Sequence, residues 1–196
     1  MACRLRFEHP KPELVIAQTG TSLGYDVVSA IIESALRLLP IDNTPEGIRR
    51  RQAKETEKAN KADDAESAFV NRLLEVDPRL LRESQQQTQI KAALEAGRHD
   101  VVRLTPDALL SRGVRICGKE CTWVEFKNTF GFRSSPFVAA KNKKQFRKYA
   151  SSLGPGMVVY KLGYEMDHVK IENVHCFREA EVLQWLDNLD GSSTIN

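Results

Sequence analysis

The chain of 196 residues is long enough for one domain with a small appendage, and 41% apolar residues suffice for a packed core. Its formal net charge of +3 is only mildly basic, so the total charge does not by itself require a nucleic-acid partner. No run approaches the roughly 20 apolar residues of a membrane span. The start, MACRLRFEHPKPE, has neither the apolar core of a secretory signal nor the character of a transit peptide. We therefore expect a soluble, intracellular protein of the nucleus, the cytoplasm or both.

Residues 1–43 predict a small N-terminal helical appendage. Pro10 and Pro12 favour a loosely ordered lead-in. From Tyr25 to Leu39, apolar residues recur at a spacing of 3.6 residues, which predicts an amphipathic helix. This helix is either ordinary core packing or the second helix of a helix-turn-helix motif. Core packing is favoured, because no partner helix is evident before it.

Residues 44–63 are almost all charged or small, so they form either a solvated helix or a disordered linker to the main domain, residues 64–196. The elements expected in that domain are helices over 65–76 and 79–96, two strands of a hairpin over 107–127 with its turn at 118–120, a helix over 139–153, strands over 157–162 and 173–177, and a closing helix over 179–189. Strands interleaved with helices indicate an α/β fold.

Three charged side chains interrupt the predicted hairpin. Asp107 lies at the head of the first strand, and Glu125 and Lys127 lie at the end of the second. Side chains alternate between the two faces of a strand, so Glu125 and Lys127 share one face while Val124 and Phe126 share the other. The two charged residues of the second strand are therefore neighbours on one surface.

Two carboxylates beside a lysine fit metal-dependent hydrolysis of a phosphodiester. Carboxylate oxygens suit Mg²⁺, while an ammonium group orients the attacking water and offsets charge that builds on the phosphate. The pattern is PD…(D/E)xK, here Pro106-Asp107 followed by Glu125-Phe126-Lys127. Taken alone, this pattern fits a solvent-facing edge hairpin equally well, because an acid and a lysine two residues apart are common.

The helix predicted over 139–153 carries both a basic cluster and a Q-h-x-x-Y arrangement. Gln145 and Tyr149 are four residues apart and so lie on one face, where they could hydrogen-bond a phosphate or a metal-bound water. A helix this basic can also lie along a phosphate backbone. The nucleic-acid contacts expected from it are Lys141, Lys143, Lys144, Arg147, Lys148 and Tyr149.

The order of these motifs on strand, strand and helix resembles the PD-(D/E)xK nuclease superfamily, and the last motif resembles its RecB-type branch. The segments TPDALL, CTWVEFKNTFG and QFRKYASSLGPGMVVYKLGY resemble the eukaryotic family named for its TPD motif, a family of codanin-interacting, nuclease-like proteins. The resemblance is strongest from Leu104 to Tyr164. The predicted helix from Tyr25 is also similar to the last part of that family's N-terminal helical region.

The resemblance implies a restriction-endonuclease-like mixed sheet flanked by helices. It implies a metal-dependent nuclease, similar to Holliday junction resolvases, that hydrolyses phosphodiester bonds in nucleic acid, with DNA expected before RNA. Asp107 and Glu125 would bind Mg²⁺ or Mn²⁺, Lys127 would be the catalytic lysine, and Gln145 would support the site. Glu66 is the nearest candidate for a third acidic metal ligand, and a codanin-like protein is an expected partner.

An inactive nuclease fold that serves as an adaptor for nucleic acid or for a protein partner is the alternative. Intact Asp107, Glu125 and Lys127 favour the enzyme, because an adaptor has no need of all three. The N-terminal helical region is shorter than the family norm and the third acid is weakly defined, and both points favour the adaptor.

Overall fold

The computed structural model describes residues 10–38, 42–133 and 138–192. The chain divides into two compact units, Met1–Thr56 and Glu57–Asn196. The division falls within one helix, α4 (Pro45–Leu73), which contains nearly all of the charged segment 44–63. Of the two alternatives for that segment, the structure has the helix. Ion pairs between successive turns support it, such as Lys61 Nζ to Glu57 Oε1 at 2.7 Å.

The first unit contains α2 (Pro12–Thr19), α3 (Tyr25–Leu38) and the beginning of α4. The amphipathic helix predicted from Tyr25 is therefore confirmed up to Leu38, and Leu39 lies outside the described residues. The expected loose lead-in is wrong in part, because Pro12 begins a helix. At the first helical position the missing N–H of proline costs no hydrogen bond. A helix thus precedes α3, although none was evident from the sequence.

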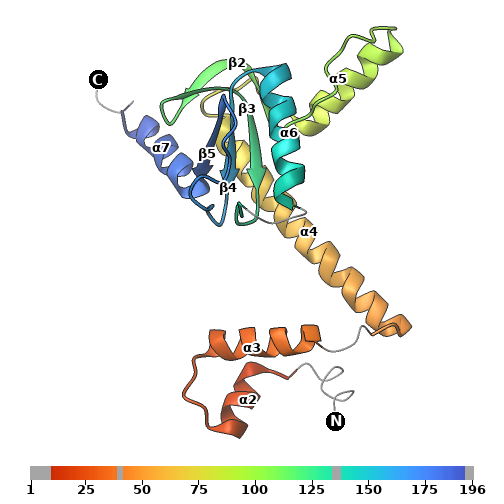
Figure 1. The fold of residues 1–196 in the computed structure, drawn as a ribbon, viewed down its shortest axis with the longest axis vertical. Coiled ribbons are helices and arrows are strands. Elements are labelled where there is room, and N and C mark those ends of the chain that lie inside the picture. The colour runs from red at the N-terminus through yellow and green to blue at the C-terminus, as the bar shows by residue number, and fades with distance from the viewer. Residues whose placement is uncertain (1–9, 39–41, 134–137, 193–196) are drawn as a thin grey trace. The chain divides into compact units, whose positions relative to one another are not determined.

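A five-stranded mixed sheet forms the centre of the second unit (Figure 1). Its strands are β1 (Leu81–Arg82), β2 (Ala108–Ile116), β3 (Lys119–Lys127), β4 (Gly156–Tyr160) and β5 (Val174–Arg178), and they neighbour one another in that order. The pairs β1–β2 and β2–β3 are antiparallel, whereas β3–β4 and β4–β5 are parallel. A parallel pair needs a crossover connection, and α6 (Val138–Leu153) supplies it between β3 and β4.

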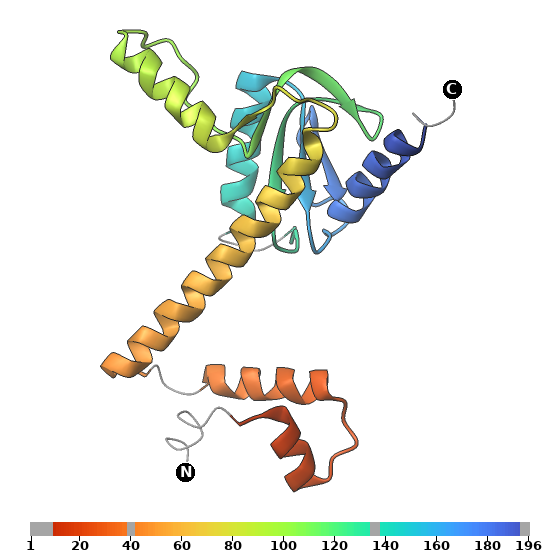
Figure 2. The ribbon, with the colours of Figure 1, turned by 180° about the vertical axis from the view of Figure 1, so that it is seen from behind.

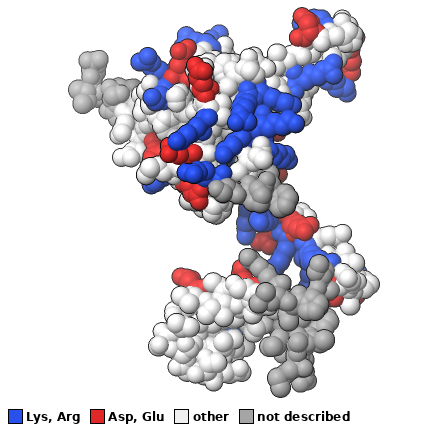
Figure 3. Space-filling model, viewed as in Figure 1, with Lys and Arg blue, Asp and Glu red and all other residues white. Residues whose placement is uncertain are grey.

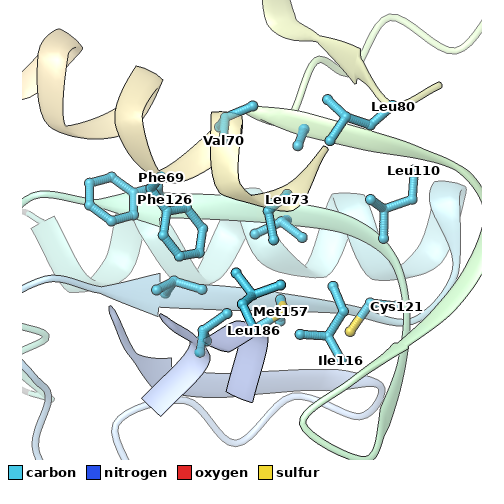
Figure 4. Close-up of a cluster of buried hydrophobic side chains, with 14 residues drawn as sticks. Phe69, Val70, Leu73, Leu80, Leu110, Ile116, Cys121, Phe126, Met157 and Leu186 are labelled. Carbon is cyan, nitrogen blue, oxygen red and sulfur yellow. The ribbon is translucent and has the colours of Figure 1, made fainter. Parts of the chain in front are cut away.

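Helices cover both faces of this sheet (Figures 1 and 2). The end of α4 and α7 (Glu179–Ser192) cover one face, and α6 covers the other. Figure 4 shows the first interface, where Phe69 and Leu73 of α4 meet Phe126 and Met157. The rings of Phe69 and Phe126 stack with centroids 5.0 Å apart. The expected mixed α/β sheet flanked by helices is confirmed.

Two details of the predicted elements are corrected by the structure. The helix expected over 79–96 is α5 (Glu83–Glu95), because Leu81 and Arg82 instead pair with β2 as an edge strand. The hairpin turn lies one residue earlier than expected, at Cys117 and Gly118, which have φ angles of 49° and 73°. Positive φ at both central residues is the requirement of the tight turn that joins Ile116 to its partner Lys119.

Gly156 begins β4 directly beside Trp123, and a Cβ at this position would overlap the indole ring. Because Trp123 is fully buried, the ring cannot move aside cheaply. We expect Gly156→Ala to lower the free energy of unfolding by about 1–3 kcal/mol, as measured by urea denaturation. Gly113→Ala is the control, since its Cβ would meet only the end of the Glu120 side chain. Equal urea midpoints for the two variants would contradict this close approach.

Candidate active site

Glu125 is the centre of a hydrogen-bonded cluster on the face of the sheet that α6 covers. It is only 2% exposed. Its Oε1 accepts hydrogen bonds from Lys127 Nζ at 2.5 Å and from Gln145 Nε2 at 2.9 Å. Its Oε2 is buried and has no hydrogen-bond partner among the described residues. The structure thus brings together the strand acid, the strand lysine and the helix glutamine, with one carboxylate oxygen left over.

Asp107 joins this cluster from the neighbouring strand. It directly precedes β2, and its Oδ2 accepts a hydrogen bond from the backbone N–H of Phe126 at 2.6 Å. Burial raises the pKa of Asp107, and the charges of Glu125 and Glu66 raise it further. Burial also raises the pKa of Glu125, although Lys127 and Gln145 act in the opposite direction. The two carboxyl groups therefore oppose each other's ionisation.

A divalent cation would relieve this repulsion. Mg²⁺ usually binds through one or two carboxylates and completes its shell with water and substrate phosphate oxygens. The leftover Oε2 of Glu125 and the adjacent Asp107 carboxyl group fit that requirement. Over residues 10–38, 42–133 and 138–192 no group of three or more His, Cys, Asp and Glu side chains is placed to hold a metal ion. Asp107 and Glu125 are therefore the two protein ligands that the structure offers.

Glu66 lies on α4 and belongs to the electrostatic surroundings of this pair. Burial raises its pKa, and the charge of Glu125 is the next largest cause. Glu83, the first residue of α5, raises the pKa of Glu66 as well. Glu83 was not expected from the sequence, where it has no motif around it. Its Oε1 accepts a hydrogen bond from Thr105 Oγ1 at 3.3 Å, two residues before Asp107.

The loop that presents Asp107 is held through its backbone carbonyls. Gln86, which is 3% exposed, donates through Nε2 to the carbonyl oxygens of Pro106 and Leu81, both at 2.8 Å. The Tyr149 hydroxyl donates to the carbonyl of Thr105 at 3.3 Å. Sequence reasoning missed Gln86, because it lies in the polar run Ser-Gln-Gln-Gln-Thr-Gln, where nothing distinguishes one glutamine from the next.

Tyr149 connects this loop to the cluster, because its hydroxyl also accepts a hydrogen bond from Gln145 Nε2 at 2.8 Å. We expect Tyr149→Phe to reduce kcat of metal-dependent cleavage by about 10–100-fold, the usual effect of losing a group that orients a metal ligand. KM for the nucleic acid should change little. Tyr164→Phe is the matched control, since that hydroxyl donates at 2.9 Å to the carbonyl of Cys176. Equal kcat values for both variants would show that the Tyr149 hydroxyl does not position the site.

The cluster opens into a groove of about 740 Å³ along α6. Its lining residues are Leu104, Lys127, Lys141, Asn142, Lys144, Gln145, Lys148 and Tyr149. Figure 3 shows Lys and Arg side chains gathered over this part of the molecule. Four of the six nucleic-acid contacts expected from the sequence thus line the groove. Lys143 and Arg147 do not, and instead line a second hollow together with Arg133.

The fold and the site define a mixed α/β protein with paired buried carboxylates, a lysine and a basic groove. The chain belongs to the family described as "Protein of unknown function TPD sequence-motif", whose model matches residues 48–180. The expected family is therefore confirmed, and the matched range includes every residue of the cluster and the groove.

Curated relatives carry a nuclease name. The chain is 37% identical over 79 residues to "CDAN1-interacting nuclease 1" of Gallus gallus, and 34% identical over 79 residues to the protein of that name in Xenopus laevis. The matched segment covers 40% of this chain, 26% of the chicken protein and 23% of the frog protein. The chain thus spans about a quarter of the length of these relatives. No solved structure matches it.

One general property of the helices bears on where the site operates. Within the described parts of the chain, none of the helices combines the length and the apolar character needed to cross a bilayer.

Proposed function

We propose that the protein is a metal-dependent nuclease of the PD-(D/E)xK type that hydrolyses phosphodiester bonds, in DNA before RNA. The observation that carries this proposal is the cluster in which Lys127 and Gln145 both donate to Glu125 beside Asp107. The cluster lies at a groove with three further lysines, which suits a polyanionic substrate. The names of the relatives and the mixed sheet support the same class of activity.

Each residue of the cluster has a role in this proposal. Asp107 and Glu125 would hold Mg²⁺ or Mn²⁺, which when bound activates water and offsets charge on the phosphate. Lys127 presents an ammonium group to the same space, where it orients the water and stabilises the developing negative charge. Gln145 holds Glu125 in place through its 2.9 Å hydrogen bond, and Tyr149 in turn holds Gln145.

A protein partner and a second function follow from other observations. The relatives are named as CDAN1-interacting, and on that ground we propose a codanin-like partner for this chain. An inactive adaptor is the second candidate function. What favours it is that the described residues contain no group of three carboxylate, His or Cys side chains placed for a metal ion.

Cleavage assays with the full chain distinguish the enzyme from the adaptor. Duplex, flapped, four-way and single-stranded DNA would be incubated with wild type in Mg²⁺ or Mn²⁺, alongside Lys127→Ala and the control Lys119→Ala at the exposed hairpin turn. We expect cleavage by wild type and by Lys119→Ala, and loss of cleavage in Lys127→Ala. If wild type and Lys127→Ala were equally inert on every substrate, the adaptor would replace the enzyme.

A further inference from the structure

The exposed face of α6 is cationic from one edge to the other. Successive residues of an α-helix are rotated by about 100°, so Lys141 and Lys148 project near one edge of this face while Lys143 and Arg147 project near the opposite edge. The first pair lines the groove that contains Lys127. The second pair lines a separate hollow of about 310 Å³. The basic residues of α6 thus form two tracks instead of one.

The second hollow collects positive charge from three separate segments. Arg133 follows β3, Lys143 and Arg147 come from α6, and Lys170 comes from the loop before β5. Asp167 also lines the hollow and is paired with Lys170 at 3.1 Å. Glu165 at its border accepts the backbone N–H of Arg133 at 2.7 Å. Four cationic side chains therefore meet two acidic ones, and the hollow is left with excess positive charge.

The floor of the hollow does not offset this charge. His168 lines it and is only 3% exposed. Its Nε2 is hydrogen-bonded to the Tyr160 hydroxyl at 2.7 Å. Burial lowers the pKa of His168, and the charge of Lys143 lowers it further, so the ring is neutral at physiological pH. An anionic ligand from outside the chain would match the remaining charge of Arg133, Lys143 and Arg147.

We propose that α6 contacts two phosphate backbones, one in the groove and one in the second hollow, so that the nucleic acid bound there is double-stranded. This inference rests on the proposed function for its class of ligand. An α-helix with its side chains is about 10–12 Å wide, and the major groove of B-form DNA, about 12 Å wide, admits it between two backbones. A single strand has one backbone and needs only one of the two tracks.

The salt dependence of binding tests the two tracks separately. A fluorescent duplex and a single strand of the same length would be titrated in EDTA with wild type, with the hollow variant Lys143→Gln/Arg147→Gln, and with the groove variant Lys141→Gln/Lys148→Gln. Each lost phosphate contact lowers the slope of log K against log salt by roughly 0.9 for a duplex and roughly 0.7 for a single strand. We expect the hollow variant to lower the duplex slope by roughly 1.8 and to leave the single-strand slope unchanged.

The groove variant should lower both slopes. Arg115→Gln/Lys119→Gln is the control, because it removes the same charge from the exposed hairpin and should change neither slope. Thermal unfolding of each variant verifies its fold. The inference is overturned if the hollow variant lowers both slopes, which would indicate one continuous single-strand track. It is equally overturned if that variant lowers neither.

The cleavage assay keeps this outcome apart from the proposed function. If wild type cleaves but the hollow variant binds duplex as wild type does, the two-backbone inference fails and the nuclease stands. If the hollow variant selectively loses duplex binding while wild type cleaves nothing, the inference stands and the nuclease fails. If wild type binds neither nucleic acid, both are overturned.

Discussion

Glu125→Gln should abolish metal-dependent cleavage while leaving the protein folded. The amide has the same shape as the carboxyl group and keeps an oxygen that accepts from Lys127 and Gln145. It lacks the charge that a hard cation requires. Since a bound metal contributes several kcal/mol of transition-state stabilisation, we expect a loss on the order of 10³-fold or more in the single-turnover rate. The metal-free variant should also be more stable than wild type, because a buried charge has been removed.

Glu120→Gln is the matched control for this experiment. Glu120 lies on the same strand but is exposed, and it pairs with Arg115 near the hairpin turn. Its rate should equal that of wild type. A Glu125→Gln protein that cleaved within tenfold of wild type would show that this carboxylate does not hold the ion.

The metal-free protein should lose stability as the pH rises from about 4 to about 8. Burial, together with the charges of Glu125 and Glu66, raises the pKa of Asp107 to about 8, whereas an unfolded chain has the ordinary value near 4. Between these values the folded state binds more protons than the unfolded state, so the free energy of unfolding falls with increasing pH. The stabilisation is complete below about pH 4 and is lost once the pH passes about 8. The expected loss is on the order of a few kcal/mol.

Urea denaturation in EDTA at several pH values measures this effect. Asp107→Asn should flatten the dependence and exceed wild type in stability at pH 8, whereas the exposed Asp100→Asn should follow wild type. Mg²⁺ should restore stability at pH 8 in wild type alone, because it binds the folded state through the deprotonated pair. A wild-type profile as flat as that of Asp107→Asn would contradict the raised pKa.

The parts of the site that sequence reasoning could predict are those set by local periodicity. Alternation along β3 places Glu125 and Lys127 on the face opposite Phe126, and in the structure Phe126 packs in the α4 and α7 core. Helical spacing places Gln145 beside Tyr149, and the two side chains are hydrogen-bonded. In both cases the residues concerned are at most four positions apart, so the backbone geometry of one element decides their relation.

The parts that could not be predicted depend on tertiary contacts. Leu81 and Arg82 are too short a segment to show any period, and only the adjacent β2 makes them a strand. Gln86 is selected by two carbonyl groups that fold over it. The separation of Lys143 and Arg147 from the catalytic groove depends on the loops that carry Arg133 and Lys170, whose positions no pattern within α6 reveals.

Because the two faces of β3 have opposite chemistry, the strand's alignment with its neighbours is itself encoded in the site. A shift of one residue would exchange the faces, placing Glu125 and Lys127 among Phe69 and Met157 and exposing Phe126 to α6. Such a misaligned chain would retain much of its helix and strand content and so escape detection by circular dichroism. Catalytic activity, in contrast, would require the native alignment, which makes turnover a sensitive measure of correct folding for this protein.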